Sequence, residues 1–476
     1  MAKAPLFLDV DGTFLKTDLL FESFWAGLGQ APLATLGAVF RHGRDPAALK
    51  AALAEIATLR LDLMPVREEI AEIAADARAE GHEVALASAS DARLVQELAQ
   101  IHGFDAALGS EPGRNLKGAA KAAALEEASG GSGYIYAGDS TADRPVWERA
   151  QAAIVVGDPG GARKRLAVQG HPVTPIAGGW SPRDLLRALR PHQWVKNVLL
   201  LLPMIAAHEF GLSTLLLALL GIAAFSAAAS AIYIVNDLLD LEADRLHVKK
   251  CKRPFASGKV PISVGMATSA ALILVALGLG LYLGAAFFGV VALYMALSLA
   301  YSLTLKRLRW VDIATLATLY TLRVVAGAAA TQVEASAMML IFIFPIFITL
   351  GCVKRLTELT LATSDERLPG RGYGRPDRGD LLNVSALGSV GALVVFFLYT
   401  FSDQALALYP TRWILWIAMV PMAAWLLRMV VLGYGGKQDY DPIVFALRDK
   451  MGVGILLITL SLMFYAAGLW STWFGL

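Results

Sequence analysis

The stretch LFLDVDGT, residues 6–13, gives the clearest fold signal in the chain. Its three apolar residues predict a short buried strand, and alternation across the strand end places Asp9 and Asp11 on the same side. Two carboxylates this close repel one another unless a cation or a shared proton lies between them. Gly12 permits the turn that follows. The stretch therefore predicts a strand that ends in an acidic, cation-binding turn.

Two further predicted strands end in polar residues in the same way. Residues 83–87 lead into Ser88, and residues 134–137 lead into the sequence GDSTAD at 138–143. The segments between the strands are helical in pattern, which is typical of an open parallel sheet, where ligands bind beyond the carboxyl ends of the strands. The sequence therefore predicts that these polar groups converge on one site.

Together, DxDGT and GDSxxD resemble the haloacid dehalogenase (HAD) superfamily of phosphotransferases, over about residues 5–160. The resemblance implies an α/β (Rossmannoid) domain with a small helical cap formed by residues 14–80. It implies that Asp9 is the nucleophile, forming an aspartyl-phosphate, and that Asp11 is the general acid/base. The residues it assigns to phosphate and Mg²⁺ are Ser88, Lys117 with Lys121 as its rival, Asp9, Asp139, the backbone carbonyl of Asp11, and Asp143 in support. A degenerate domain kept as a scaffold or regulator is the alternative.

Composition separates the rest of the chain from this domain. The 476 residues are 56% hydrophobic and 17% charged, whereas soluble proteins carry about 25% charged residues, so a purely soluble protein is excluded. The net charge of +2 gives no argument for nucleic acid, and two cysteines cannot form a disulfide framework. We expect a domain at 1–178, an amphipathic connector that runs into the first span at 179–196, and a membrane domain at 190–476.

Long uncharged runs in the second half predict an all-α bundle of nine membrane spans. They are residues 190–207, 213–236, two spans within 261–305, 311–331, 335–353, 381–402, 413–427 and 451–476. Lysine and arginine concentrate in the loops after the even-numbered spans, which predicts that these loops and the N-terminal domain are cytoplasmic. The N-terminus has no apolar run of signal-peptide length. We therefore expect an inner-membrane protein with its C-terminus outside.

The sequence NDLLDLEAD, residues 236–244, is the strongest site signal in the membrane half. On a helix, Asn236, Asp240 and Asp244 recur every four residues, and Asp237 joins them on the same face. Acidic residues so near a bilayer mark functional sites. Carboxylates combined with a substrate phosphate suit Mg²⁺, and a basic run follows at 245–253. The segment therefore predicts a site for a magnesium-bound diphosphate.

This segment resembles the first aspartate motif of the UbiA superfamily of membrane prenyltransferases, over about residues 183–476. QWVKN at 193–197 and YSLTLK at 301–306 extend the resemblance. Aromatic prenyltransferases of the superfamily carry a second aspartate cluster, where this chain has Lys354, Arg355 and Glu358. Two cations would instead bind phosphate directly. The motifs together look like the branch that transfers phosphoribose to a polyprenyl phosphate.

The resemblance implies a donor, phosphoribosyl pyrophosphate, and a polyprenyl (decaprenyl-type) phosphate acceptor in the lipid bilayer, with the HAD-like domain removing the 5-phosphate. A prenyltransferase acting on an aromatic acceptor, with an independent or regulatory HAD domain, is the alternative. Chain length of the isoprenoid and a homo-oligomeric state stay open. The residues assigned to the donor diphosphate and its Mg²⁺ are Asn236, Asp237, Asp240, Asp244, Arg253 and Lys306. Those assigned to the acceptor phosphate or the ribose phosphate are Lys196, Lys354 and Arg355, with Tyr301 and Asp312 as weaker candidates.

Overall fold

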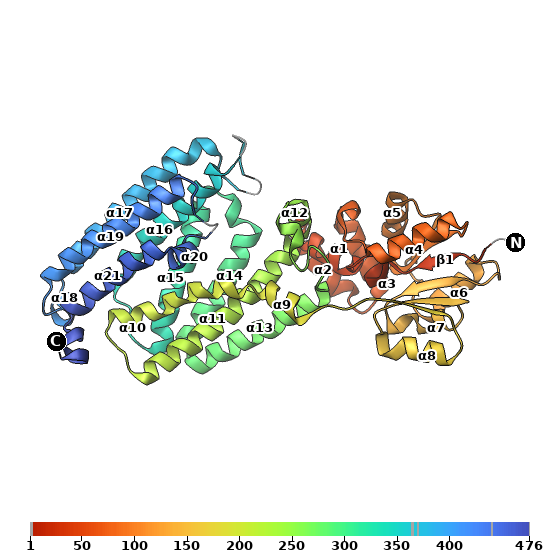
Figure 1. Ribbon diagram of the computed structural model, residues 1–476, viewed down its shortest axis with the longest axis horizontal. Coiled ribbons are helices and arrows are strands. Elements are labelled where there is room, and N and C mark those ends of the chain that lie inside the picture. Colours follow the sequence, from red (N-terminus) through yellow and green to blue (C-terminus); the bar gives the residue numbers. More distant parts are fainter. Residues whose placement is uncertain (1–2, 363–365, 369–370, 439–440, 476) are drawn as a thin grey trace. The chain divides into compact units, whose positions relative to one another are not determined.

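The computed structural model describes residues 3–362, 366–368, 371–438 and 441–475. It divides into two compact units, which are described separately. The first unit comprises Met1–Leu189 and Tyr233–Ser269, and the second comprises Arg190–Ile232 and Ala270–Leu476. Figure 1 shows the chain coloured along its sequence. The segment Tyr233–Ser269, which carries the NDLLDLEAD motif, thus packs with the N-terminal domain.

A six-stranded parallel sheet, in the order β3-β2-β1-β4-β5-β6, forms the centre of the first unit. Its strands are β1 (Leu6–Leu8), β2 (Val84–Asp91), β3 (Ala106–Ser110), β4 (Ile135–Gly138), β5 (Ala152–Val156) and β6 (Val173–Ile176). Leu6 of β1 pairs with Val84 on one side and with Ile135 on the other. The three strands that the sequence predicts are therefore neighbours, and their carboxyl ends lie at one edge.

Helices cover both faces of this sheet, as alternating side chains require. Leu6 and Leu8 face a core shared with α4 (Glu68–Ala79) and α5 (Ala92–His102). Phe7 faces the opposite core, formed with α6 (Ala119–Ala128), α7 (Arg144–Trp147) and α8 (Ala162–Val168). The predicted α/β domain is confirmed.

Three helices inserted between β1 and β2 form the predicted cap. They are α1 (Leu19–Gln30), α2 (Pro32–His42) and α3 (Pro46–Ile56), and they pack against one another. Asp18 and Asp45 cap α1 and α3 by accepting hydrogen bonds from backbone N–H groups of the first turn. The capped helix starts and the packing of the three helices against one another therefore define the cap.

Within the described residues, seven helices are long and apolar enough to cross a membrane. They are α11 (Leu212–Leu239), α13 (Ile262–Leu283), α14 (Ala285–Leu303), α15 (Val311–Thr331), α16 (Ala337–Thr360), α17 (Arg378–Tyr399) and α19 (Trp413–Tyr434). Each corresponds to a predicted span. The chain is therefore an integral membrane protein with a helical second half.

The first and last predicted spans are shorter. Residues 191–206 form the 3₁₀ segment η5 (Pro191–Leu201) followed by one turn of α-helix, α10 (Leu202–Ala206). Proline at each start removes a backbone donor, which suits a helix terminus and not a helix interior. The last span is α21 (Lys450–Ala466), which has 17 residues. The count of nine spans stays a prediction.

The remaining helices are short. They are α9 (Pro182–Leu189), α12 (Leu241–Leu246), α18 (Asp403–Leu408), α20 (Pro442–Arg448) and α22 (Leu469–Phe474). Helix α9 lies where the sequence predicts the amphipathic connector, and α12 carries the end of the aspartate motif. Helix α20 begins at Pro442 in the loop before the last span.

Candidate active sites

Two aspartates follow β1 directly, as predicted. The Asp11 carboxylate accepts hydrogen bonds from Ser88 Oγ at 3.1 Å and from Ser90 Oγ at 2.7 Å, both at the end of β2. It also accepts one from the backbone N–H of Leu19, at 2.7 Å, where the cap begins. Asp11 is therefore oriented by the sheet and the cap together. Ser90 is a partner that the sequence analysis missed.

Lys121, on α6, neutralises the Asp9 carboxylate. Its Nζ lies 2.9 Å from Asp9 Oδ1 and 3.5 Å from Asp143 Oδ1, and it donates to the Tyr136 hydroxyl at 2.9 Å. Lys117, the first choice from sequence, is exposed in the loop before α6. This corrects the assignment in favour of the rival lysine. Lysine spacing alone could not decide it, because the start of α6 determines which side chain points to the sheet.

Three carboxylates form a group that fits a cation. Ligand oxygens of Asp9, Asp139 and Asp143 all lie within 4.8 Å of one another. Asp143 is fixed by Tyr136, whose hydroxyl donates to it at 2.8 Å, and by the backbone N–H of Ser140 at 3.0 Å. A rigid cluster of carboxylate oxygens is the donor set that Mg²⁺ prefers. Asp9 and Asp139 would hold the ion, with Asp143 beside them, and the ion would screen the charge of an incoming phosphate.

Electrostatics agree with this reading. Burial, together with the neighbouring Asp143 and Asp11, raises the pKa of Asp139 to about 7. Burial also raises the pKa of Asp9 well above its usual range, and Lys121 opposes that shift. For Lys121 itself, burial acts to lower the pKa, but Asp9 and Asp143 outweigh it and raise the pKa. The acidic group is thus destabilised without a cation, which is the condition expected of a metal site.

The cap adds two cations that the sequence analysis missed. Lys50, on α3, donates to the backbone carbonyl of Ala89 at 2.5 Å, directly beside Ser88 and Ser90. Burial lowers the pKa of Lys50, and Asp11 and Asp18 oppose that shift. Arg67 donates to the backbone carbonyls of Gly12 at 3.0 Å and Thr13 at 3.2 Å, and so fixes the turn. Only the fold brings these residues to the end of β1.

The aspartate motif of the membrane half bends at its middle residue. Helix α11 ends at Leu239, Asp240 takes a non-helical conformation, and α12 begins at Leu241. Backbone hydrogen bonds from Asp240 to Asn236 and from Asp244 to Asp240 nevertheless continue the i to i−4 pattern. The continuous helix that the sequence predicts is therefore replaced by two helices that keep the same register.

Arg253 bridges the two ends of this motif. Its Nη1 lies 3.0 Å from Asp237 Oδ1 and 2.6 Å from Asp244 Oδ2, and both carboxylates are buried. One cation between two carboxylates shows that the pair can hold positive charge. Asp240 is half-buried at the bend. That these carboxylates hold Mg²⁺ stays a prediction, based on the preference of the ion for carboxylate oxygens.

The neighbouring residue joins the motif to the cap. Arg245 and Glu22 of α1 form a fork of two hydrogen bonds, Nη2 to Oε1 at 2.5 Å and Nη1 to Oε2 at 3.1 Å. Their side chains are only 7% and 4% exposed. Thr17 donates to the same carboxylate at 2.6 Å, and Arg245 Nε donates to the Ala256 carbonyl at 3.2 Å. We refer to this arrangement as the Glu22–Arg245 pair; the sequence analysis did not foresee it.

In the second unit, Arg355 is enclosed by acids. It donates to both oxygens of Asp312, to Glu358 and to the Tyr301 hydroxyl, and its side chain is fully buried. Arg371, partly exposed, donates to the same hydroxyl at 3.2 Å. The charge of Arg355 is therefore already neutralised in this structure, and its assignment to a phosphate stays a prediction. Tyr301 and Asp312 are part of the network that neutralises it.

A second polar group in this unit combines Lys354, next to Arg355 on α16, with Lys196 and Asp441 from other segments. Lys196, in η5, is buried and pairs with Asp441 at 2.5 Å. Asp441 also accepts backbone hydrogen bonds as the N-cap of α20. Lys354, one residue before Arg355, lies close enough to Asp441, Glu358 and Lys196 to interact electrostatically. Asp441 was missed, although the Asp-Pro pair at 441–442 is a helix-start signal.

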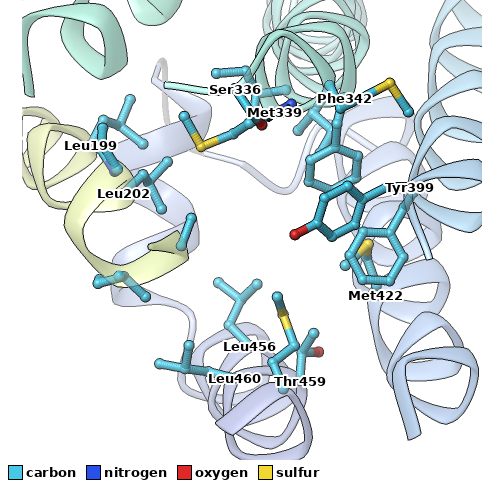
Figure 2. Close-up of a pocket in the computed structure, with 18 of the residues that line it drawn as sticks. Leu199, Leu202, Ser336, Met339, Phe342, Tyr399, Met422, Leu456, Thr459 and Leu460 are labelled. Carbon is cyan, nitrogen blue, oxygen red and sulfur yellow. Dashed lines mark hydrogen bonds between the residues drawn. The ribbon is translucent and has the colours of Figure 1, made fainter. Parts of the chain in front are cut away.

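An apolar cavity of about 430 Å³ lies in the second unit. In Figure 2, Leu199 and Leu202 line one side, Met339 and Phe342 of α16 another, and Leu456 and Leu460 of α21 a third. The cavity has the size of a small-molecule site. Three of its lining residues, Leu199, Leu350 and Ile443, lie two to four positions from Lys196, Lys354 and Asp441. The apolar cavity and the polar group therefore share η5, α16 and α20.

These two sites define the class: the chain belongs to the UbiA prenyltransferase family, whose model matches residues 197–448, and it carries an N-terminal haloacid dehalogenase-like hydrolase domain at residues 6–148. An uncharacterized protein of Sinorhizobium fredii, y4nM, is 34% identical over 94% of this chain and 88% of its own length. Decaprenyl-phosphate phosphoribosyltransferase of Mycobacterium tuberculosis is 32% identical over 56% of this chain and 88% of its own length. A solved UbiA homolog from Archaeoglobus fulgidus, bound to GPP and Mg²⁺, matches with 16% identity and a TM-score of 0.45, over 60% of this chain and 99% of its own.

The two family resemblances seen in the sequence are thereby confirmed. Lys306 lies half-buried in the 3₁₀ turn η7 (Leu305–Arg307), and Asn236 is half-buried near the end of α11. The roles given to the individual site residues stay predictions.

Proposed function

We propose that the membrane half transfers 5-phosphoribose from phosphoribosyl pyrophosphate to a polyprenyl phosphate. The HAD-like domain then removes the 5-phosphate to give polyprenyl-phosphoryl ribose. The named activity of the mycobacterial relative supports the transfer step. A product that carries a 5-phosphate is a substrate for a phosphatase, which supports the pairing of the two domains.

The observation that carries the proposal is the apolar cavity that adjoins a cationic group. On α16, Leu350 lines the cavity and Lys354 lies one helical turn further, on the same face. In η5, Leu199 lines the cavity three residues after Lys196. A polyprenyl chain would occupy the apolar part, and its phosphate would meet the two lysines.

On the donor side, Asp237, Asp240 and Asp244 would hold Mg²⁺ and the diphosphate, with Asn236 orienting it. Lys306 and Arg253 would stabilise the diphosphate as it leaves. The attacking lipid phosphate is already ionised at neutral pH, so no strong general base is required. Catalysis then rests on positioning and on stabilisation of the leaving group.

In the HAD-like domain, Asp9 would attack the 5-phosphate and form an aspartyl-phosphate, while Asp11 donates its proton to the leaving ribose oxygen. Asp11 would next take a proton from water, which attacks phosphorus and releases inorganic phosphate and free Asp9. Ser88 and Lys121 would hold the phosphate. The basic loops support a cytoplasmic location of this domain, with the C-terminus on the other side of an inner membrane.

The test uses purified protein in nanodiscs with labelled phosphoribosyl pyrophosphate, Mg²⁺ and decaprenyl phosphate. Asp240→Ala should abolish labelling of the lipid, whereas Glu242→Ala, an exposed neighbour on α12, should not. Asp9→Asn should leave transfer intact and let the 5-phosphorylated lipid accumulate. No labelled lipid from the wild type would refute the transfer step. An unchanged lipid product in Asp9→Asn would refute the coupled phosphatase step alone.

The second candidate is a prenyltransferase with an aromatic acceptor. Family membership favours it, since the family model is that of prenyltransferases. Against it, Glu358 is paired with buried Arg355, so the site lacks the free carboxylates of a second aspartate cluster within the described residues. Consumption of an isoprenyl diphosphate with an aromatic compound, without ribose turnover, would establish this candidate.

A further inference from the structure

Helix α2 of the cap presents its large apolar side chains outward. Leu33, Leu36 and Phe40 lie at positions i, i+3 and i+7, on one face of the helix. They are 86%, 52% and 95% exposed. The inward face carries the small residues Thr35 and Ala38, which are buried. This pattern is the reverse of a soluble amphipathic helix, whose large apolar residues face the core.

The polar residues around this apolar face are cationic. Arg41 and Arg44 are exposed, and His42 is half-buried, at the C-terminal end of α2. Apolar side chains bordered by basic residues match a bilayer interface, where acyl chains lie beneath anionic headgroups. A protein partner of the same shape would need an acidic rim, whereas a membrane that contains anionic lipid supplies one directly.

The cap is also joined to the segment that follows the apolar helix α11. The Glu22–Arg245 pair joins α1, the helix before α2, to a residue six positions after the end of the apolar helix α11. The end of α12 and the segment after it expose Leu246 and Val248 beside Lys249 and Lys250, which is again an interfacial composition. Both segments lie in the first unit. An apolar helix attached there is within reach of the membrane surface.

We propose that α2 lies in the membrane interface, with Leu33, Leu36 and Phe40 inserted among the lipids and Arg41 and Arg44 on anionic headgroups. The cap of the HAD-like domain then binds the surface that holds a lipid-linked substrate. This extends the proposed function, because a phosphatase acting on a ribose phosphate attached to a lipid needs its cap at that surface. The insertion itself does not depend on which reaction the domain performs.

Spin labels test the insertion directly. A nitroxide is attached at Phe40→Cys in the full chain, with Cys251 and Cys352 replaced by serine, in nanodiscs of phosphatidylcholine and phosphatidylglycerol. Oxygen should relax this label more than a water-soluble nickel complex does. The control is Val168→Cys on α8, an apolar residue that is 80% exposed, where nickel should dominate. Equal behaviour at the two positions would overturn the proposal. The proposal would also be overturned if the label at position 40 were shielded from nickel only when two copies share a disc, since a second copy of the chain would then cover α2.

A kinetic arm separates this inference from the proposed function. Phe40→Asp should lower hydrolysis of the 5-phosphorylated lipid by about tenfold or more and leave hydrolysis of p-nitrophenyl phosphate unchanged. Val168→Asp should alter neither. If the wild type hydrolyses only the soluble ester, the lipid substrate is refuted, and the label at position 40 still decides the insertion. If Phe40→Asp leaves lipid hydrolysis unchanged, surface binding has no role in this reaction.

Discussion

Removal of Arg245 should release the aspartate motif from the cap. Glu22, which is 4% exposed in the wild type, loses both hydrogen bonds of the fork in Arg245→Ala and retains the one from Thr17. Loss of one partner of a buried ion pair costs about 3–5 kcal/mol. That energy corresponds to an increase of roughly 10²- to 4 × 10³-fold in local opening, since 1.4 kcal/mol is a factor of ten.

Hydrogen–deuterium exchange of the full chain in nanodiscs measures this opening. Peptides covering residues 241–258 should exchange faster in Arg245→Ala, whereas peptides from β1 and β4 should not change. The double variant Glu22→Gln with Arg245→Met should recover most of the protection, because a neutral pair leaves no buried charge. The matched control is Arg149→Ala, whose ion pair with Glu126 is about half exposed. It should cost less than about 1 kcal/mol.

Unchanged exchange at 241–258 in Arg245→Ala would refute the reasoning, because the ion pair would then contribute nothing to holding the segment. Failure of the double variant to recover would show that packing, and not charge, dominates. The pair is not alone in that role. A Cβ added at Gly258 would lie 2.5 Å from Lys16 Cβ, so the loop also packs closely against the start of the cap.

Three further outcomes are expected. Lys121→Met should lower phosphatase kcat/KM by about 10² or more, whereas Lys117→Ala should have a small effect, as measured with p-nitrophenyl phosphate. Asp18→Asn keeps the helix cap but removes a carboxyl whose pKa burial and Asp11 raise to about 7. Between about pH 4 and pH 7 the folded wild type binds more protons than the unfolded chain, so its free energy of unfolding falls as pH rises through that range. Relative to the wild type, Asp18→Asn should therefore gain about 1–3 kcal/mol in stability at pH 8 and little at pH 4. The gain should be seen as slower hydrogen–deuterium exchange in α1. Lys354→Met should raise the KM for polyprenyl phosphate without unfolding, whereas Arg355→Met should destabilise the bundle by about 3–5 kcal/mol in thermal unfolding.

Local patterns predicted the parts of the fold that depend on local physics. The strand at residues 6–8 and its acidic turn follow from a short apolar run and a glycine. The long spans follow from uncharged runs of sufficient length. The first span was less regular than predicted, because prolines at 191 and 203 interrupt it. The bend at Asp240 was also missed, since helical spacing alone does not show where a helix ends.

Site residues were predictable where a motif carries them and not where the fold brings them together. Asp9, Asp11, Ser88 and Asp139 gather as expected because the three parallel strands β1, β2 and β4 end at one edge. Lys50 reaches the site from a cap helix, and Asp441 reaches Lys196 from a distant loop. No spacing in the sequence connects these pairs. The full neutralisation of Arg355 was missed because Asp312 lies on another helix, although Glu358 is only three residues further along α16.

The packing of residues 233–269 with the N-terminal domain matters for anyone who separates the two halves. A protein that starts at residue 190 would keep Arg245 but lose its partner Glu22. The segment between α11 and α13 would then lack the folded domain against which it packs. Swapping halves between relatives should therefore be done with the loop and the cap exchanged together.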